Sequence, residues 1–389
     1  MRGKLLRILA VLCLLGIAVW VLDASAKGMS GAAGGRDFIA YWAAGQQLVH
    51  GASPYDGPAI LKLEATAGLT GNRPAFMLNL PIAFFLAWPL GFVSSSLGMI
   101  LWTLAIVASL MVSVRMLWIL LGRPEGRLHL LAYLFAPVLA CLMAGQLGTF
   151  MLLGVVAFLY FHETRPWLAG AALLLCAIKP HLFLAFGVVI VAWALWQRAY
   201  QVLAGISVAL AASFGFSVLV DRQSWSQYSA MMRSTEKVLQ EFIPTWSVML
   251  RVLIDRNAVW LQFMPMIAGA IWGLWFFWSR RNRWNWMEHG LLLLIVSEMC
   301  SAYAWFTDEV VLLPAILAAL YRAEENGRSL WVFAILTGAA LAEVMTQVQI
   351  ITPFYLWTVP AWLGWYLYAT RNSGPKTVAV SEGAPSRVG

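Results

Sequence analysis

An acid and a base stand side by side near the start of a very hydrophobic chain, as Arg36 and Asp37 in the stretch GGRDFIAYWAAGQQLVHGASPYD at 34–56. Ionisable residues at a membrane edge are costly, so they indicate a functional site. Apolar surroundings raise the proton affinity of a carboxylate, which makes Asp37 a candidate general base. Alternatively, Asp37 caps a helix by accepting hydrogen bonds from backbone N–H groups. The chemistry of the residue alone fits both interpretations.

Lys179 and His181 flank Pro180 between two apolar segments, one of which is short. The ammonium of a lysine is a point charge that suits the phosphate of a lipid. We therefore predict Lys179 as a ligand of a donor phosphate, with Arg36 and His181 beside it. The alternatives are a snorkelling lysine at a helix end and a histidine that packs at the interface.

Several polar and aromatic residues could bind a sugar, because rings stack on its C–H faces while carboxylates and amides bind its hydroxyls. The candidates for sugar or acceptor binding are Gln146, Tyr41, Trp42, Tyr303, Asp308 and Glu309. Gln146 could equally cap a short turn in AGQLG. The aromatic residues around 303–306 could equally belong to the belt that anchors a protein at a membrane interface.

The elements that must position these residues are transmembrane helices. Of the 389 residues, 61% are hydrophobic and 11% are charged, against roughly 45–50% and 25% in soluble domains. The long apolar runs favour helices over the alternating segments of a β-barrel. The net charge of +8 is explained by Lys and Arg in cytoplasmic loops, so we expect no nucleic-acid partner.

The positive-inside rule places five basic loops and both termini in the cytoplasm: 122–127, 162–166, 197–201, 279–283 and 321–328. About twelve crossings then follow, near 5–22, 97–121, 128–145, 147–162, 166–179, 181–197, 200–220, 258–279, 288–304, 307–321, 330–348 and 352–370. All the candidate residues fall on the extracytoplasmic face. This shared location favours Asp37 as a catalytic base over Asp37 as a cap.

We predict one polytopic domain, 1–370, and a disordered cytoplasmic tail, 371–389. The outer loops are 23–96 and 221–257. Within the first, the prolines near 76–92 predict a re-entrant piece. The helical spacing of its apolar residues predicts an amphipathic helix along the membrane surface; these residues are Phe38, Tyr41, Trp42, Gly45 and Leu48.

A metal site has weak support in the sequence. Asp37, Asp56, Asp308 and Glu309 carry oxygens that suit Mg²⁺ or Mn²⁺. No Asp-x-Asp pair occurs in the first outer loop, and no phosphate-binding glycine loop occurs in the chain. We therefore expect a metal-independent reaction with no cofactor and with a lipid, rather than a nucleotide, as the donor.

The stretch RDFIAYWAAGQQLVHGASPYD resembles the first-loop signature of glycosyltransferase family 87, also known as DUF2029. The pattern of that signature is D-[FL]-x-x-Y-W-x-A-x-x-x-L-x-x-G-x-x-P-Y-D. Similar segments follow in order over nearly the whole chain: LPIAFFLAWPLGFVSSSLGMILW, GQLGTFMLLGVVAF, RPWLAGAALLLCAIKPHLFLAF and the aspartate of WFTDEVVLLP. Two departures are FMLNLP in place of Tyr-Pro-Pro, and Tyr303 where many relatives have the histidine of Ser-Pro-His.

The resemblance implies a polytopic enzyme of the GT-C class in a bacterial inner membrane. Such an enzyme transfers a sugar, mannose in the best-known members, from a polyprenyl-phosphate carrier to a lipid or glycan acceptor on the extracytoplasmic face, with inversion. It also implies that Asp37 is the base and that Lys179 holds the phosphate. A lipid or polysaccharide transporter or flippase is the rival, although such proteins show internal repeats and midplane sites. A catalytically silent relative is a third interpretation.

Overall fold

The described part of the chain is built from helices, with no β-strand among its residues. The structure is a computed structural model that describes residues 36–69, 71–234, 243–346 and 353–371. The all-α class predicted from the long apolar runs is therefore confirmed. The predicted crossing at 5–22 and the tail after Arg371 lie outside the described residues.

Three described segments are long and apolar enough to cross a membrane, by length and composition: α5 (Ser95–Leu120), α11 (Tyr200–Val220) and Val259–Arg283. The last comprises η5 (Val259–Phe263), α15 (Met264–Arg280) and η6 (Arg281–Arg283). These segments coincide with the crossings predicted near 97–121, 200–220 and 258–279. The protein is therefore a membrane protein, as its composition predicts.

The other predicted crossings coincide with helices that are shorter or interrupted. Single helices are α7 (Gly148–Phe161), α10 (Leu184–Trp196) and α18 (Trp331–Thr346). Interrupted pairs are η3 (Leu128–Leu134) with α6 (Ala136–Ala144), α8 (Pro166–Ala172) with α9 (Leu174–Ala177), η7 (Trp286–Gly290) with α16 (Leu291–Met299), η8 (Phe306–Leu312) with α17 (Leu313–Glu325), and η9 (Pro353–Trp357) with α19 (Thr358–Thr370). Proline in the first turn of α6 and α17 explains two of the breaks, because its ring excludes a continuous helix. The total of twelve crossings stays a prediction.

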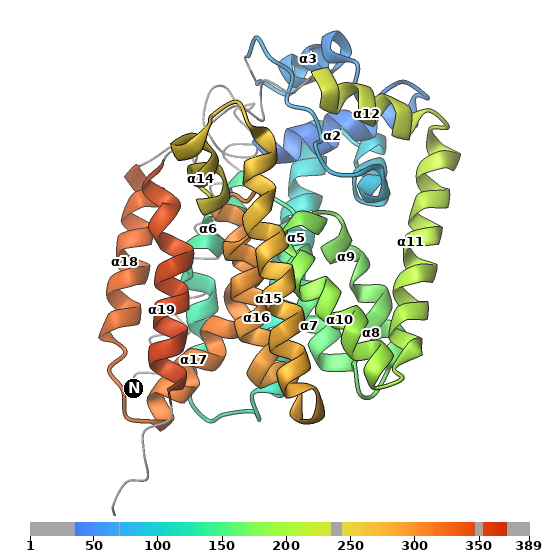
Figure 1. Cartoon of the computed structure of the whole chain (residues 1–389). Helices are drawn as coiled ribbons and strands as arrows, with labels where there is room; N and C mark the ends of the chain where they lie inside the picture. Colours follow the sequence, from blue (N-terminus) through green and yellow to red (C-terminus); the bar gives the residue numbers. More distant parts are fainter. Residues whose placement is uncertain (1–35, 70, 235–242, 347–352, 372–389) are drawn as a thin grey trace, which may run out of the picture.

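Short helices gather at one end of the molecule (Figure 1). We call them the cap: α2 (Arg36–Val49), α3 (Gly57–Thr66), the broken segment η1–α4–η2 (Pro81–Phe92) and α12 (Ser224–Ser234). A further short helix, α14 (Trp246–Ile254), lies near the same end. The segment predicted to be re-entrant is thus a series of three short pieces.

Helix α2 is buried within the protein along most of its length, with Gln46, Gln47 and Val49 half-buried, and its position along a membrane surface stays a prediction. Tyr41, Trp42 and Leu48 are buried, but so are Ile39 and Ala43 from the opposite face. The indole N–H of Trp42 donates to the carbonyl of Val93 at 2.9 Å. Backbones meet at Gly45 and Gly91, where a Cβ on either residue would lie 2.2 Å from a carbonyl oxygen. This close approach seats α2 against η2.

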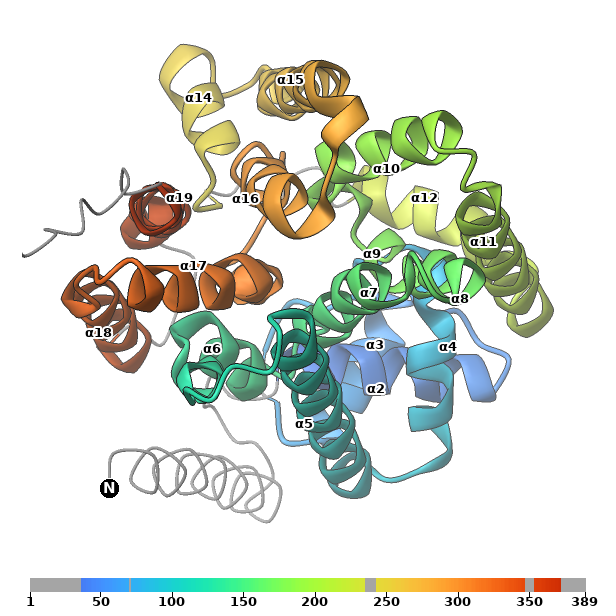
Figure 2. The ribbon, with the colours of Figure 1, turned by 90° about the horizontal axis from the view of Figure 1, so that it is seen from below.

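Seen along the bundle (Figure 2), α7 lies near its middle, packed against α5, α8 and η8. The helix α17 is buried along most of its length. The turns that precede these two helices, and the turn between α9 and α10, carry polar residues into the interior. The core therefore positions a polar site at the ends of its central helices.

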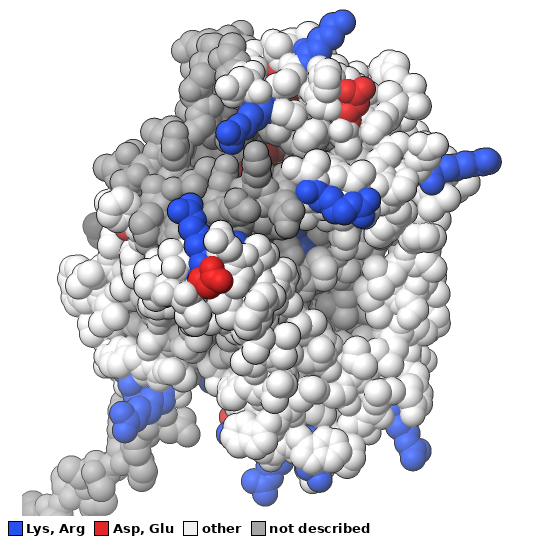
Figure 3. Space-filling model, turned by 45° about the horizontal axis from the view of Figure 1, so that its top comes forward, with Lys and Arg blue, Asp and Glu red and all other residues white. Residues whose placement is uncertain are grey.

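Charged side chains are sparse along the length of the bundle. In the face shown in Figure 3, Lys and Arg lie near the two ends, with an uncharged surface between them. The turns after α5, α7, α10 and α15 lie at the end opposite the cap (Figure 1). Those turns are four of the basic loops of the sequence, so the basic turns and the cap occupy opposite ends.

Candidate functional site

A buried ion pair stands at the centre of the site. The ammonium of Lys179 lies 2.6 Å from Oδ1 of Asp308, with side-chain exposures of 9% and 0%. Lys179 directly precedes η4 (Pro180–Leu182), and Asp308 belongs to η8. The sequence analysis placed these residues on one face, and the structure brings them into contact across 129 positions of the chain. Removing one partner of such a pair costs about 3–5 kcal/mol, because it leaves a buried charge.

The turn that begins η8 holds Asp308 in place. Its second oxygen, Oδ2, accepts a hydrogen bond from the backbone N–H of Trp305 at 3.0 Å. The backbone N–H of Asp308 donates in return to the carbonyl of Trp305 at 2.8 Å. Both carboxylate oxygens of Asp308 therefore have protein donors, and the ion pair is fixed relative to Trp305.

The turn between α6 and α7 joins the ion pair to α2. Oε1 of Gln146 accepts hydrogen bonds from the hydroxyl of Tyr41 at 3.1 Å and from the N–H of Leu147 at 3.3 Å. The indole N–H of Trp102 donates to the carbonyl of Gly145 at 2.8 Å. Gln146 thus closes its own turn, as one of the two interpretations from sequence expected, and it also binds a tyrosine of the cap. Its contact with a sugar stays a prediction.

Two glycines of this turn allow close approach on either side. Gly145 has a left-handed conformation, with φ of 70°, which glycine adopts at little cost. A Cβ there would lie 2.9 Å from Cβ of Phe38, and a Cβ on Gly148 would lie 2.8 Å from the carbonyl oxygen of Thr307. The turn is therefore packed between α2, which carries Asp37, and η8, which carries Asp308.

Asp37 is half-buried in the first turn of α2. Because α2 begins at Arg36, Asp37 lies inside the helix, where a carboxylate favours the helix dipole. The pKa of Tyr41 is raised, first by burial and then by the charges of Asp37 and Asp308. The two acids therefore lie within electrostatic reach of one phenol. The side chain of Arg36 lies outside the described part, and its role stays a prediction.

Aromatic side chains form a wall beside the ion pair. The rings of His181 and Tyr303 meet edge to face with centroids 5.4 Å apart. The indole N–H of Trp305 donates to the hydroxyl of Tyr303 at 2.7 Å. Tyr303 thus contacts His181, and the three rings occupy one side of the site.

Glu309 points away from Asp308 and toward α19. Its two oxygens accept hydrogen bonds from the hydroxyl of Thr358 and, at 3.0 Å, from the indole N–H of Trp362. Glu309 is 4% exposed. Its predicted contact with a sugar is untested, but its carboxylate already has a protein donor on each oxygen.

Glu298, at the end of α16, is the acid that the sequence analysis missed. It is 3% exposed, and neither carboxyl oxygen has a hydrogen-bond partner among the described residues. Burying a polar group without a partner costs about 1–3 kcal/mol. The signal was present, because Glu298 interrupts the apolar run LLLLIVSEMC, and an ionisable residue inside such a run indicates function.

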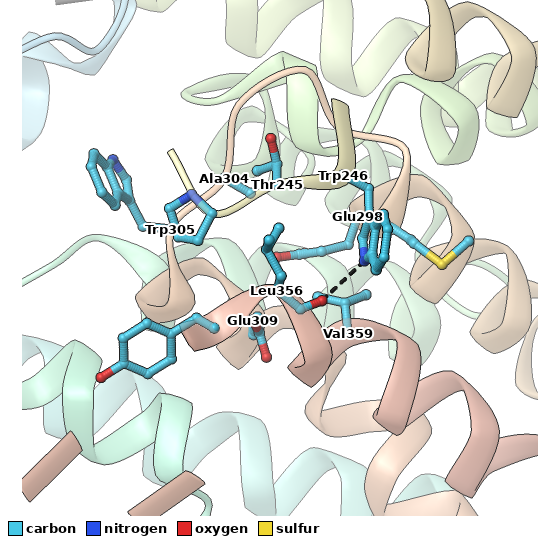
Figure 4. A pocket seen from close by; sticks show the side chains of 11 residues that line it. Thr245, Trp246, Glu298, Ala304, Trp305, Glu309, Leu356 and Val359 are labelled. Atoms are coloured by element: carbon cyan, nitrogen blue, oxygen red, sulfur yellow. Dashed lines mark hydrogen bonds between the residues drawn. The ribbon is translucent and has the colours of Figure 1, made fainter. Parts of the chain in front are cut away.

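Glu298 lines a small pocket together with Glu309, Trp305, Thr245 and Trp246, and its side chain extends among them in Figure 4. The pocket offers about 20 Å³ of space to the centre of a water-sized sphere. About 10–15 Å³ on this measure holds one water molecule. Oγ1 of Thr307 and Nε2 of His181 also lack a hydrogen-bond partner in the described part of the chain, so several polar atoms around Asp308 share this feature.

No described residues form a group of three or more His, Cys, Asp or Glu that could bind a metal ion. Asp56, one of the acids considered for such a site, instead caps α3, where its side chain accepts a hydrogen bond from the N–H of Ala59 at 3.3 Å. Asp56 therefore belongs to the cap and not to the ion pair.

Comparison with known families gives one match. The sequence model of glycosyltransferase family 87 matches residues 78–302, which is more than half of the chain. The matched region includes Gln146, Lys179 and Glu298, whereas Asp37 and Asp308 lie outside it. No curated protein and no solved structure matches the chain.

Proposed function

Because this chain belongs to glycosyltransferase family 87, we propose that it transfers a sugar, mannose, from a polyprenyl-phosphate carrier to a lipid or glycan acceptor. Family membership indicates glycosyltransferase activity in a membrane protein. The carrier, the sugar and the roles of individual residues are our proposal.

The observation that carries the proposal is the gathering of one cation, several acids and an amide around the turn between α6 and α7. Lys179 and Asp308 pair on one side of that turn. Helix α2, which bears Asp37, packs on the other side of the turn. A membrane chain that brings these groups together at the ends of its helices has the parts needed for transfer from a phosphate leaving group.

Asp37 is the proposed general base. It takes the proton of the acceptor hydroxyl, and the acceptor oxygen forms a bond with the anomeric carbon of the sugar. The bond between that carbon and the carrier phosphate breaks, and its electron pair stays on the phosphate oxygen. Attack from the side opposite the phosphate inverts the anomeric configuration.

Lys179 is the proposed ligand of the departing phosphate. An ammonium has three N–H donors, and one of them binds Asp308. The other two are available to phosphate oxygens, whose charge grows as the bond breaks. Asp308 then acts as a positioning residue that holds Lys179. Arg36 is the further cation that we assign to the phosphate, and His181 is a further ring N–H donor to it.

We place the cap and the site on the extracytoplasmic side of a bacterial inner membrane, with both termini in the cytoplasm. The support is that the basic turns lie at the end opposite the cap, where the positive-inside rule expects cytoplasm. Partners are then the lipid-linked donor, the acceptor and the surrounding lipids, with no cofactor.

The test is a product assay with the purified chain in liposomes. The donor is polyprenyl-phosphate mannose with a radiolabelled sugar, and octyl mannoside serves as the acceptor probe. We expect free polyprenyl phosphate and labelled octyl dimannoside in equal amounts. Movement of the intact donor between leaflets without release of carrier would instead establish a flippase. If carrier is released only from donors with another sugar, the assignment of mannose is wrong but the proposed transfer stands. If no donor releases its carrier, the proposed function is wrong.

A further inference from the structure

The pocket at the end of α16 contains a polar group that the proposed chemistry does not use. Both oxygens of Glu298 lack a hydrogen-bond partner among the described residues, although the residue is only 3% exposed. Across the same pocket, Glu309 has a donor on each oxygen. The burial of Glu298 is therefore not explained by hydrogen bonds from the described residues.

The size of the pocket limits what Glu298 can bind. About 20 Å³ of space admits one group of the size of a water molecule or a hydroxyl. A hard cation requires six or more oxygen ligands, while both oxygens of Glu309 are already engaged. A hydroxyl group fits the space and supplies a donor and an acceptor.

The residues that line the pocket suit the C–H groups next to such a hydroxyl. Trp305 and Tyr355 contribute aromatic rings, and Trp246 is 49% exposed at the same place. Thr245 adds a hydroxyl, whose oxygen accepts a hydrogen bond from the N–H of Val248 at 3.2 Å. A ligand that combines apolar C–H groups with a hydroxyl matches this lining.

The pocket is joined directly to the ion pair. Trp305 lines it and also donates its backbone N–H to Asp308 at 3.0 Å. Glu298 is close enough to interact electrostatically with Lys179, Asp308 and Glu309. A sugar whose phosphate lies at Lys179 would therefore have one of its hydroxyls within the region of Glu298.

We propose that Glu298 binds one hydroxyl of the transferred sugar, and that the pocket formed with Thr245, Trp246 and Trp305 selects sugars by the presence of that hydroxyl. This inference rests on the proposed function and adds a determinant of sugar specificity to it. Glu298 hydrogen-bonds the sugar and takes no part in breaking the bond to phosphate.

Mono-deoxy donors test the inference. The polyprenyl-phosphate mannose series lacking one hydroxyl at a time is assayed with the wild type and with Glu298→Met. We expect the variant to lose about 10- to 100-fold in kcat/KM with the full sugar, the range for a hydrogen bond to a buried polar group. One deoxy donor should be poor for the wild type and no poorer for the variant. Equal losses with every donor, or no loss, would overturn the subsite.

Two controls separate the subsite from the function. Glu288→Gln changes an exposed glutamate of η7 and should match the wild type. Binding of intact polyprenyl-phosphate mannose in the absence of an acceptor, followed by tryptophan fluorescence, requires no transfer. If no donor is turned over but Glu298→Met still weakens this binding at least 10-fold, the function fails and the subsite stands. If transfer is normal and Glu298→Met matches the wild type with all donors, the subsite fails and the function stands.

Discussion

Two neighbouring regions of the site differ in whether their buried acids have hydrogen-bond donors from the protein. In the region of η8, Asp308 accepts from Lys179 and Trp305, and Glu309 accepts from Thr358 and Trp362. At the end of α16, Glu298 accepts from no described residue. A buried acceptor with protein donors supports the fold, whereas one without them lowers stability. Asp308 and Glu309 are therefore structural acids of the site, whereas Glu298 is the acid that we propose to bind a ligand.

The same contrast holds for aromatic residues. At the other end of the bundle, Trp193, Trp284 and Phe158 surround Trp286 with centroid separations of 4.9–5.5 Å. These rings contact one another edge to face, so packing alone accounts for their presence in this cluster. Beside the ion pair, Tyr303 and Trp305 adjoin groups with unpartnered atoms, so aromatic content alone does not identify the site.

The largest expected effect on stability comes from breaking the ion pair. Lys179→Met should lower the free energy of unfolding by about 3–5 kcal/mol, because it leaves Asp308 as a buried charge. Thermal unfolding in detergent measures the change. Lys62→Met, at an exposed lysine of α3, is the matched control. A loss in Lys179→Met no greater than in the control would remove the contrast between the two regions.

Glu309→Met should have a smaller effect of about 1–3 kcal/mol, because it leaves the indole N–H of Trp362 buried without an acceptor. The single hydroxyl proton of Thr358 has the carbonyl of Tyr355 at 2.7 Å as an alternative acceptor, so Thr358 keeps a partner in the variant. The same unfolding measurement applies. A variant as stable as the wild type would show that Glu309 is not a structural acid.

Tyr41→Phe should cost about 0.5–1.5 kcal/mol, the net worth of one hydrogen bond. The ring remains packed against Trp102, with centroids 5.3 Å apart, and Gln146 keeps its bond from Leu147. A cost above that of Glu309→Met would mean that the link between cap and core carries more of the stability than the acids of η8.

Glu298→Met should have the smallest effect on unfolding, between no change and a gain in stability. Replacing an unpartnered buried acid by an apolar side chain of similar length removes a desolvation cost. A loss comparable to that of Glu309→Met would contradict the distinction drawn here, because it would reveal protein contacts that hold Glu298.

Hydropathy predicted the positions of the helices well, because apolar runs report directly on helices within a bilayer. The predicted crossing at 200–220 and helix α11 share their bounds. The pair of Lys179 with Asp308 was predicted only as a shared face, since contact across the chain depends on packing. The burial of α2 was not predicted, because an apolar helix face fits lipid as well as protein. The close contact with η2 depends on Gly45 and Gly91, which lie on separate segments and meet only in the folded chain. Glu298 could not be assigned to the site from sequence, because a single acid in an apolar run does not reveal whether the fold supplies it with a partner.

The central claim is that Asp37 removes the proton of the acceptor hydroxyl. The most direct measurement is turnover of polyprenyl-phosphate mannose by Asp37→Asn, with Asp56→Asn as the control, since asparagine caps a helix as well as aspartate does. We predict that Asp37→Asn lowers kcat about 100- to 10,000-fold, the contribution of a general base, while donor binding and unfolding stay close to wild type. Near wild-type turnover by Asp37→Asn would contradict the account.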